Sequence, residues 1–254
     1  MTICIAAICT EDTEDYIVFA VDHMLTVGGL GQFEHNIKKY SQLNNTTVGM
    51  LAGKTMHTDY FFDNSFDNMS FESISQDLFN KFNLKKEDII QKEILNKYNI
   101  DFNFVHDLLN KPQLNGFSSE IIKAISNIKL GVAILLIGFI DGKAKIIEVN
   151  DNNIFDVSVL TFHAIGSGHP QAKNALLFQR HSKDDGLRVC LYNVYKAKKN
   201  AEVSEGVGKE TELGFLSKDG VKILDKSDIE ILDKIYNQEL NFGKDNELLS
   251  DLNI

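Results

Sequence analysis

The chain has 254 residues, of which 43% are hydrophobic, so it can bury a sizeable core as one large domain or two small ones. Its formal net charge of -10 argues against a nucleic acid or an anionic membrane surface as the main partner, because both would repel it. The longest apolar run, 131–140, is about half as long as a membrane-spanning helix requires, so we predict no membrane span.

The first fifty residues have the pattern of a sheet. Apolar and β-branched runs at 2–10 and 16–21 flank an acidic turn and predict a hairpin. Two further strands are expected at 37–43 and 46–52, around an Asn-Asn pair, because asparagine tolerates the positive φ of a tight turn.

The connection 27–36 between these strand pairs is rich in glycine. It lacks the lysine, the spacing and the strand-to-helix context of a phosphate-binding loop. We therefore expect a flexible connection there.

The middle of the chain has helical spacing. Apolar residues recur three and four apart and predict helices at 71–82, 86–98 and 118–127. Ser70 and Lys85 each precede acidic residues, which the helix dipole favours in a first turn.

Strands return after residue 131. Runs at 132–140 and 144–149 are joined by Asp-Gly, a strong signal for a two-residue hairpin turn, and a further strand or strand pair is expected at 155–164. The remaining predicted elements are helices at 170–179, 184–202 and 225–240 and strands at 212–217 and 221–224.

Two of the late helices have an apolar face that should be buried. The residues on these faces are Leu187, Cys190, Leu191, Val194 and Ala197 in the first, and Ile229, Leu232, Ile235 and Tyr236 in the second. The order of strands and helices predicts an α/β fold of two antiparallel sheets covered by helices, a four-layer αββα sandwich. Without a repeat or a low-complexity linker, one domain is expected over 1–254.

Several segments, in this order along the chain, resemble those of proteasome β-subunits and related bacterial peptidases. They are TICIAA at 2–7, VFAVD at 18–22, IKKY at 37–40, VGMLAG at 48–53, AIGSG at 164–168 and FLSKDG at 215–220. Each pattern is common by itself, and the specificity comes from their order. The chain resembles in particular the short, propeptide-free bacterial and archaeal relatives that begin Met-Thr, which implies the fold of the N-terminal nucleophile (Ntn) hydrolases.

The resemblance implies that Thr2 is a nucleophile, exposed when Met1 is removed. A threonine hydroxyl needs a base, and the α-amine of a terminal threonine can serve as one. Such an amine, with a pKa of about 7.7 to 8.0, is mostly protonated at neutral pH, so a neighbouring cation that favours loss of its proton is useful. By resemblance Lys39 is that cation and Asp22 holds it in place. Taken alone, a strand-end aspartate is usually a turn cap, and a Lys-Lys pair is usually a solvated edge.

Gly53 and Ser167 complete the catalytic residues that the resemblance implies. Gly53 would offer a backbone N–H to the oxyanion that develops on the attacked carbonyl. Ser167 would orient the amine of Thr2. The plain alternatives are a strand-ending turn for Gly53 and a helix-capping serine for Ser167.

The resemblance fails in one supporting loop and in one long segment. Family members have an aspartate, and a serine three residues later, where this chain has Ser204 and Val207. Glu202 or Glu205 could replace them after a shift of register. The helical segment 84–117 is longer than in family members, and we expect an insertion that caps a pocket or changes ring contacts.

No metal or cofactor is expected, because the histidines show no zinc-type spacing among themselves or with the cysteines. Cys4, Cys9 and Cys190 are expected to be small buried side chains. No secretory signal precedes them in this sequence, so a cytoplasmic location is the simplest expectation.

The function that the resemblance implies is that of a threonine-type peptidase, acting through an ester on Thr2. Two alternatives stay open: an amide ligase or transpeptidase, in which an amine resolves the same ester, and a non-catalytic, proteasome-like structural subunit. The resemblance also implies a peptide or protein substrate and a homo-oligomer, as a ring or an open helical assembly. Side-chain specificity, ring size and an ATPase partner do not follow from it.

Overall fold

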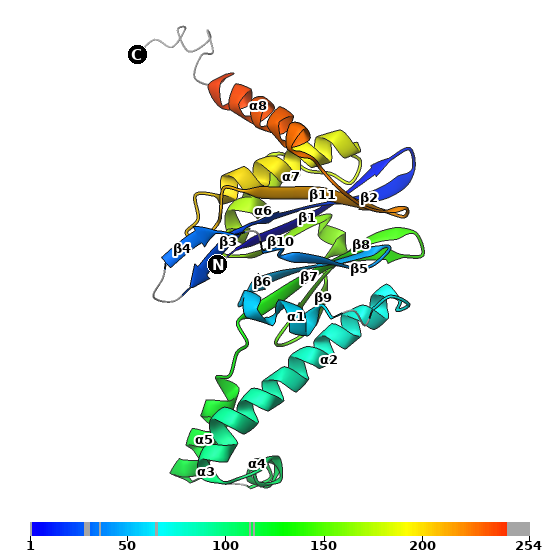
Figure 1. The fold of residues 1–254 in the computed structure, drawn as a ribbon. Helices are drawn as coiled ribbons and strands as arrows, with labels where there is room; N and C mark the ends of the chain where they lie inside the picture. The colour runs from blue at the N-terminus through cyan, green and yellow to red at the C-terminus, as the bar shows by residue number, and fades with distance from the viewer. Residues whose placement is uncertain are drawn as a thin grey trace.

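The computed structural model describes residues 2–27, 31–35, 37–63, 66–111, 113 and 115–242. Two five-stranded antiparallel sheets lie at its centre and pack against each other (Figure 1). Sheet I has the order β10-β1-β2-β11-β12 and sheet II the order β5-β6-β7-β8-β9. The strands of sheet I are β1 (Ile3–Glu11), β2 (Glu14–Asp22), β10 (Phe162–Gly166), β11 (Thr211–Ser217) and β12 (Gly220–Ile223). Those of sheet II are β5 (Tyr40–Asn44), β6 (Thr47–Gly53), β7 (Val132–Ile140), β8 (Lys143–Asn150) and β9 (Ile154–Asp156).

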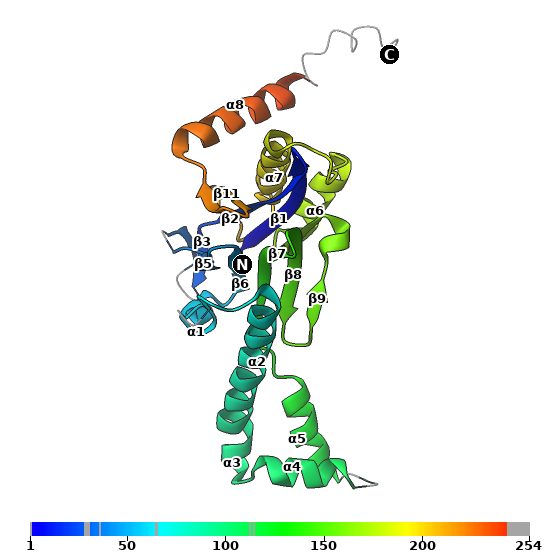
Figure 2. The same cartoon turned by 90° about the vertical axis from the view of Figure 1, so that its right-hand side faces the viewer.

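Helices cover the outer side of each sheet, which gives four layers (Figures 1 and 2). Sheet I is covered by α6 (His169–Phe178), α7 (Leu187–Ala201) and, beyond them, α8 (Lys226–Phe242). Sheet II is covered by α1 (Thr58–Phe61) and α2 (Phe71–Ile90), with a 3₁₀ turn at Thr55–His57 before α1 and another at Ser158–Leu160 before β10. The expectation of a mixed fold with antiparallel sheets and covering helices is confirmed.

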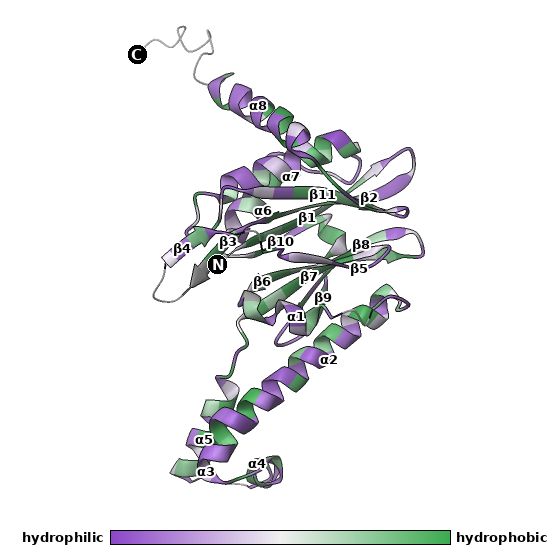
Figure 3. Cartoon of the chain, in the orientation of Figure 1, coloured by the Kyte–Doolittle hydropathy of each residue, from purple (hydrophilic) through white to green (hydrophobic). Residues whose placement is uncertain are grey.

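Alternation along the strands explains why the layers form. On β1, Ile3 and Ile5 pack against the helices of sheet I, whereas Cys4 and Ala6 pack between the two sheets, because successive side chains of a strand point to opposite faces. Both faces of sheet I are thus buried, and Figure 3 shows mostly hydrophobic residues in the central strands and alternating hydrophilic and hydrophobic residues along the helices that cover them. The three free cysteines are all buried, as expected.

The first fifty residues do not form one continuous sheet as we had expected, because β1 and β2 belong to sheet I and β5 and β6 to sheet II. The glycine-rich connection between them is also not simply a flexible loop. Its described part includes β4 (Gly31–Glu34), which pairs with β3 (Met24–Val27), the strand that leads into the connection, as a separate two-stranded sheet. Residues 28–30 and 36 lie outside the described residues.

The two helices predicted at 71–82 and 86–98 form one continuous helical run. Ser70 caps its start by accepting the N–H of Ser73 at 3.2 Å, and Glu72 lies in the first turn, as expected. No glycine or proline interrupts 71–98, so α2 continues through a π-helical turn (Gln91–Leu95) into α3 (Asn96–Tyr98). The run ends at Asn99, which adopts a left-handed conformation with φ of 53°.

The far end of α2 forms an arm with α3, α4 (Phe102–Leu109) and α5 (Gly116–Ser126) that projects away from the sheets (Figures 1 and 2). A small separate core holds the arm together, with Ile90, Ile94, Leu95 and Ile121 buried at its centre. The segment 84–117 lies in this arm, and α4 within it had not been predicted.

The apolar faces predicted for the two late helices, α7 and α8, differ in how far they are buried. That of α7 is buried or partly buried against sheet I, as predicted. In α8, Leu232 is buried and Ile229 and Tyr236 are partly buried, but Ile235 is 42% exposed, because α8 touches the body along only one narrow side. None of the described helices has both the length and the apolar character that a bilayer crossing requires.

Leu78→Ala should lower the free energy of unfolding by about 2–5 kcal/mol, because Leu78 is fully buried between α2 and sheet II and the substitution leaves a cavity. Leu84→Ala is the matched control, since Leu84 lies on the same helix but is 60% exposed, and it should change stability by no more than about 0.5 kcal/mol. Urea denaturation measures both. Equal losses would contradict the described packing of α2.

Candidate active site

Three of the predicted site residues meet where the two sheets come together. Thr2 stands just before β1 and Asp22 ends β2, and the pairing of Cys4 with Val21 brings these strand ends side by side. Lys39 comes just before β5 of sheet II, where its carbonyl accepts the N–H of Leu51 at 2.8 Å. The side chains of all three residues are buried.

The carboxylate of Asp22 is the centre of the hydrogen-bond network. Oδ1 accepts from Thr2 Oγ1 at 2.5 Å, Lys39 Nζ at 2.7 Å and Ile3 N at 2.9 Å, and Oδ2 accepts from Gly208 N at 2.9 Å and Met24 N at 3.1 Å. Lys39 Nζ also donates to Thr2 Oγ1. The threonine hydroxyl is therefore held between a cation and an anion.

Burial by itself would raise the pKa of Asp22, but the charge of Lys39 and the hydrogen bonds from Lys39, Thr2 and Gly208 outweigh it and hold the pKa below its ordinary value. Asp22 is therefore ionised at neutral pH and is a poor proton acceptor. Burial also raises the pKa of the neighbouring Cys4 thiol far above its ordinary value, so this thiol stays neutral and is a poor nucleophile.

Ser167 lies against the backbone of Thr2. Its Oγ accepts from Thr2 N at 3.3 Å and lies within donating distance of two carbonyls, Thr2 O at 3.4 Å and Glu205 O at 3.2 Å. It does not cap α6, whose N-cap is Gly168 without a side-chain hydrogen bond. Gly166 has a φ of +96°, and a Cβ there would come within 2.2 Å of Thr2 O, so this close approach requires glycine.

Gly53 stands apart from the other four predicted residues. The hydrogen bonds that join Thr2, Asp22, Lys39 and Ser167 do not include it. It ends β6 with a φ of +110°, and a Cβ there would lie 2.1 Å from Gly131 O. The close approach to Gly131 is sufficient reason for a glycine, and the link to the site runs through Leu51 and Lys39 on the same strand pair.

The loop 202–210 supports the site through its backbone and not through the expected side chains. Val207 is buried in the core of sheet I, and Ser204 Oγ is buried with no partner among the described residues. The contacts to the site are Gly208 N with Asp22 and Glu205 O with Ser167. Glu202 binds Lys198 and Lys199 instead.

Sequence patterns did not identify Gly208, because a backbone N–H can be supplied by any residue except proline. The glycines at 206 and 208 were the available signal, and Gly206 does have a positive φ of 79°. The hairpin β3–β4 holds the same loop from the other side, because Glu34 Oε1 accepts Lys209 N at 2.5 Å and Glu210 N at 3.3 Å.

A carboxylate that we had not predicted links the residues next to Asp22 and Lys39. Glu212 on β11 accepts from Tyr40 Oη at 2.9 Å and lies 3.4 Å from His23 Nε2. It thereby connects the residue after β2 with the first residue of β5.

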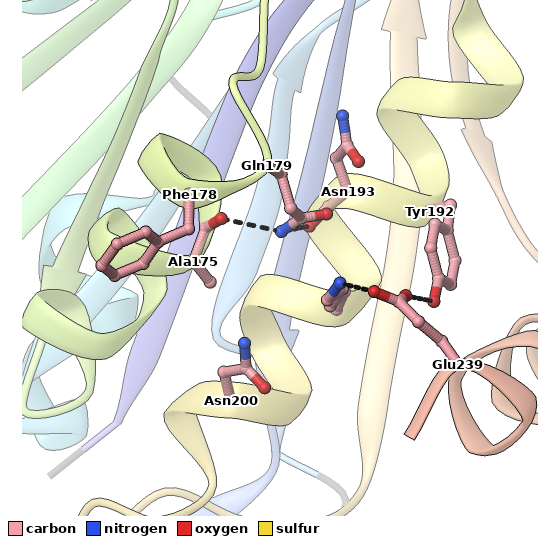
Figure 4. Close-up of a pocket in the computed structure, with 8 residues that line it drawn as sticks. Ala175, Phe178, Gln179, Tyr192, Asn193, Asn200 and Glu239 are labelled. Carbon is pink, nitrogen blue, oxygen red and sulfur yellow. Dashed lines mark hydrogen bonds and ion pairs between the residues drawn. The ribbon is translucent and has the colours of Figure 1, made fainter. Parts of the chain in front are cut away.

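A hollow with a volume of about 410 Å³ lies away from the Thr2 network, between α6, α7 and α8 (Figure 4). Its charged groups already bind one another, because both Lys196 and the Tyr192 hydroxyl donate to Glu239 of α8. The rest of the lining is Ala175, Phe178, Gln179, Asn193 and Asn200. Burial and the bond to Glu239 raise the pKa of the Tyr192 hydroxyl, which is therefore a poor nucleophile, and Glu239 is partly exposed, so the Thr2 network is the better candidate.

Within the described part of the chain, no group of three or more His, Cys, Asp or Glu side chains is arranged to hold a metal ion.

A scan against protein-family models found no family that matches the sequence, and a search of curated proteins found none similar to it. The proposal for function therefore depends on the geometry of the site and on the sequence resemblance.

Lys39→Met should destabilise the protein by about 3–5 kcal/mol, because it leaves the buried Asp22 carboxylate without its cation. Lys38→Met, at the exposed neighbouring position, is the control and should change stability by no more than about 0.5 kcal/mol. Adding Asp22→Asn to Lys39→Met should recover part of the loss. Chemical denaturation of the four proteins tests this, and an equal effect of the two lysine variants would contradict it.

The network also predicts a pH dependence. Because the folded pKa of Asp22 is depressed, its stabilising contribution is complete above the unfolded pKa of about 3.9 and is lost as pH falls through the folded value. The difference in unfolding free energy between wild type and Asp22→Asn should stay constant above about pH 5 and shrink below about pH 4. Denaturation curves across this range measure it, and a difference that does not vary with pH would refute the assignment.

Proposed function

We propose that the protein is a threonine-type N-terminal nucleophile hydrolase that cleaves peptide bonds through an ester on Thr2. The observation that carries this is the buried Thr2 hydroxyl, bonded to both Lys39 and Asp22, with Ser167 at the backbone nitrogen of the same residue. The two packed antiparallel sheets with helices on their outer sides support the Ntn-hydrolase fold that the sequence resemblance implies.

The proposed reaction requires loss of Met1, which makes the nitrogen of Thr2 a free amine. That amine takes the hydroxyl proton while Thr2 Oγ1 bonds to the substrate carbonyl carbon. Asp22 is not the base, because its lowered pKa makes it too weak, whereas an amine with a pKa of about 7.7 to 8.0 suits neutral pH. Lys39 stabilises the negative charge that develops on Oγ1, and Ser167 orients the amine.

The remaining steps follow from the same groups. The amide C–N bond breaks, the leaving amine takes the proton from the Thr2 amine, and the acyl group remains on Oγ1 as an ester. Water then attacks the ester, its proton passes through the Thr2 amine back to Oγ1, and the acid is released. Gly53 N–H is the proposed oxyanion donor, since it ends the strand that holds Lys39.

The alternatives differ from this proposal in testable ways. A ligase or transpeptidase would form the same ester and pass the acyl group to an amine, so adding acceptor amines to the reaction distinguishes it. A purely structural subunit would have no reason to bury a lysine and an aspartate around a hydroxyl, because apolar residues there would avoid the free-energy cost of burying two charges.

We also propose that the protein forms a homo-oligomer. The apolar side chains of Leu177 and Phe178 on α6 are exposed, and a contact between copies of the chain would cover them.

The proposal predicts that the purified protein lacks Met1 and gains one adduct from a peptide epoxyketone, a reagent that needs both the hydroxyl and the free amine of a terminal threonine. Thr2→Ser should still react, whereas Thr2→Val, which keeps the shape but lacks the hydroxyl, should not. Intact-mass measurement before and after treatment shows both results. Wild-type protein that keeps Met1 and gains no adduct would refute the proposal, as would an adduct on Thr2→Val.

A further inference from the structure

A second buried lysine, Lys198 on α7, has no part in the proposed reaction. Its side chain is fully buried, and Nζ donates to Glu202 Oε1 and to the carbonyl oxygen of Lys209, both at 2.7 Å. These acceptors stand at the two ends of the segment that leaves α7 and leads to β11. One ammonium group thereby closes the segment 202–209 into a loop.

Burying a lysine side chain at this position is unfavourable by itself, because its ammonium group is removed from water. Burial lowers the pKa of Lys198, against the opposing effects of Glu202 and Asp22, so the ammonium is held only because its partners compensate for lost water. A methionine would fill a similar volume without that cost, so stability alone does not explain the lysine.

The loop that Lys198 closes carries both backbone contacts to the site. Gly208 N donates to Asp22 Oδ2 at 2.9 Å, and Glu205 O lies 3.2 Å from Ser167 Oγ. Gly208 is next to Lys209, whose carbonyl Lys198 holds, so a displacement of Lys209 would move the amide that Asp22 accepts. Lys198 Nζ donates to the loop and not to Thr2, Lys39 or Asp22, so besides the long-range effect of its charge on Asp22 it acts through the loop.

We propose that Lys198 is a positioning residue, which closes the 202–209 loop so that Gly208 N meets Asp22 and Glu205 O meets Ser167. The inference rests on the proposed function, because the geometry it sets is that of the Thr2 nucleophile. It also explains how the site is supported where the expected aspartate and serine are replaced by Ser204 and Val207. A buried cation and two backbone groups take over the support of Asp22 and Ser167.

The test compares Lys198→Met with Lys199→Met. Lys199 is the matched control because it binds the same Glu202, at 3.2 Å, but is partly exposed and makes its other ion contact to Asp233 of α8. Three quantities are measured: hydrogen exchange at the Gly208 amide, the NMR titration midpoint of the Asp22 carboxyl, and the rate of epoxyketone labelling on Thr2. The first two do not depend on catalysis.

In Lys198→Met, Gly208 exchange should accelerate at least about tenfold, because the amide loses its fixed acceptor. The Asp22 midpoint should rise, since the carboxylate loses a hydrogen bond that favours its charged form and also the nearby charge of Lys198, so the exchange rate of Gly208 is the measurement that reports on the loop alone. Labelling should slow by about 10- to 100-fold, the effect of misplacing a reacting group by about 1 Å. Lys199→Met should leave the Gly208 exchange rate and the Thr2 labelling rate within about twofold of wild type. It should move the Asp22 midpoint by no more than about the same factor in proton concentration.

If Lys198→Met has the Gly208 exchange rate, the Asp22 midpoint and the labelling rate of wild type, the inference is overturned. The proposed function is unaffected by that result as long as the wild type is labelled. An unlabelled wild type would instead refute the proposed function, whatever Gly208 and Asp22 do. If Lys198→Met does not fold, Glu202→Gln serves in its place, because it keeps an acceptor for Lys198 but removes the charge. It should shift the same three quantities in the same directions by smaller amounts, and no shift would overturn the inference.

Discussion

The rest of the structure depends on one buried carboxylate. Asp22 accepts hydrogen bonds from the start of β1, from β3, from the loop before β11 and from the cation of Lys39. An ionised group without water is tolerated only when such donors surround it, so these four parts of the chain have to converge. Thr2 acquires its environment from this convergence, because Lys39, one of these donors, also donates to the threonine hydroxyl, which itself donates to Asp22.

The two-sheet architecture makes this convergence possible. Thr2 and Asp22 come from adjacent strands of sheet I, and Lys39 comes from the segment that enters sheet II, so the trio lies at the junction of two packed layers. The close-packed residues on both sides give these ends little freedom, and reactive groups on rigid elements keep their geometry without reorganisation. Gly166 adds to this, because only a residue without a side chain lets the next turn approach the Thr2 carbonyl so closely.

Support for the network comes largely from the backbone. Where the proteasome-like sequences that the chain resembles have acidic and hydroxyl side chains, this chain has the N–H of Gly208 and the carbonyl of Glu205, and Glu34 and Lys198 hold the loop that carries them. Backbone groups therefore stabilise Asp22 and Ser167 where side chains were expected to do so. A missing side chain in a motif is thus weak evidence against a site, because a backbone group in the right place can replace it.

The sequence by itself determined the features that depend on near neighbours. The Asp-Gly turn after Ile140, the strands on either side of it and the start of a helix at Phe71 depend on a few neighbouring residues and were predicted correctly. The ordered motifs pointed to Thr2, Asp22, Lys39 and Ser167 before the structure brought these four together. Only the tertiary structure decided which strands share a sheet, that the connection after Asp22 contains a hairpin, and that Lys198 and Gly208 support the site. Asp22 and Gly208 are 186 residues apart, and no local pattern specifies their contact, because it arises only when distant elements pack.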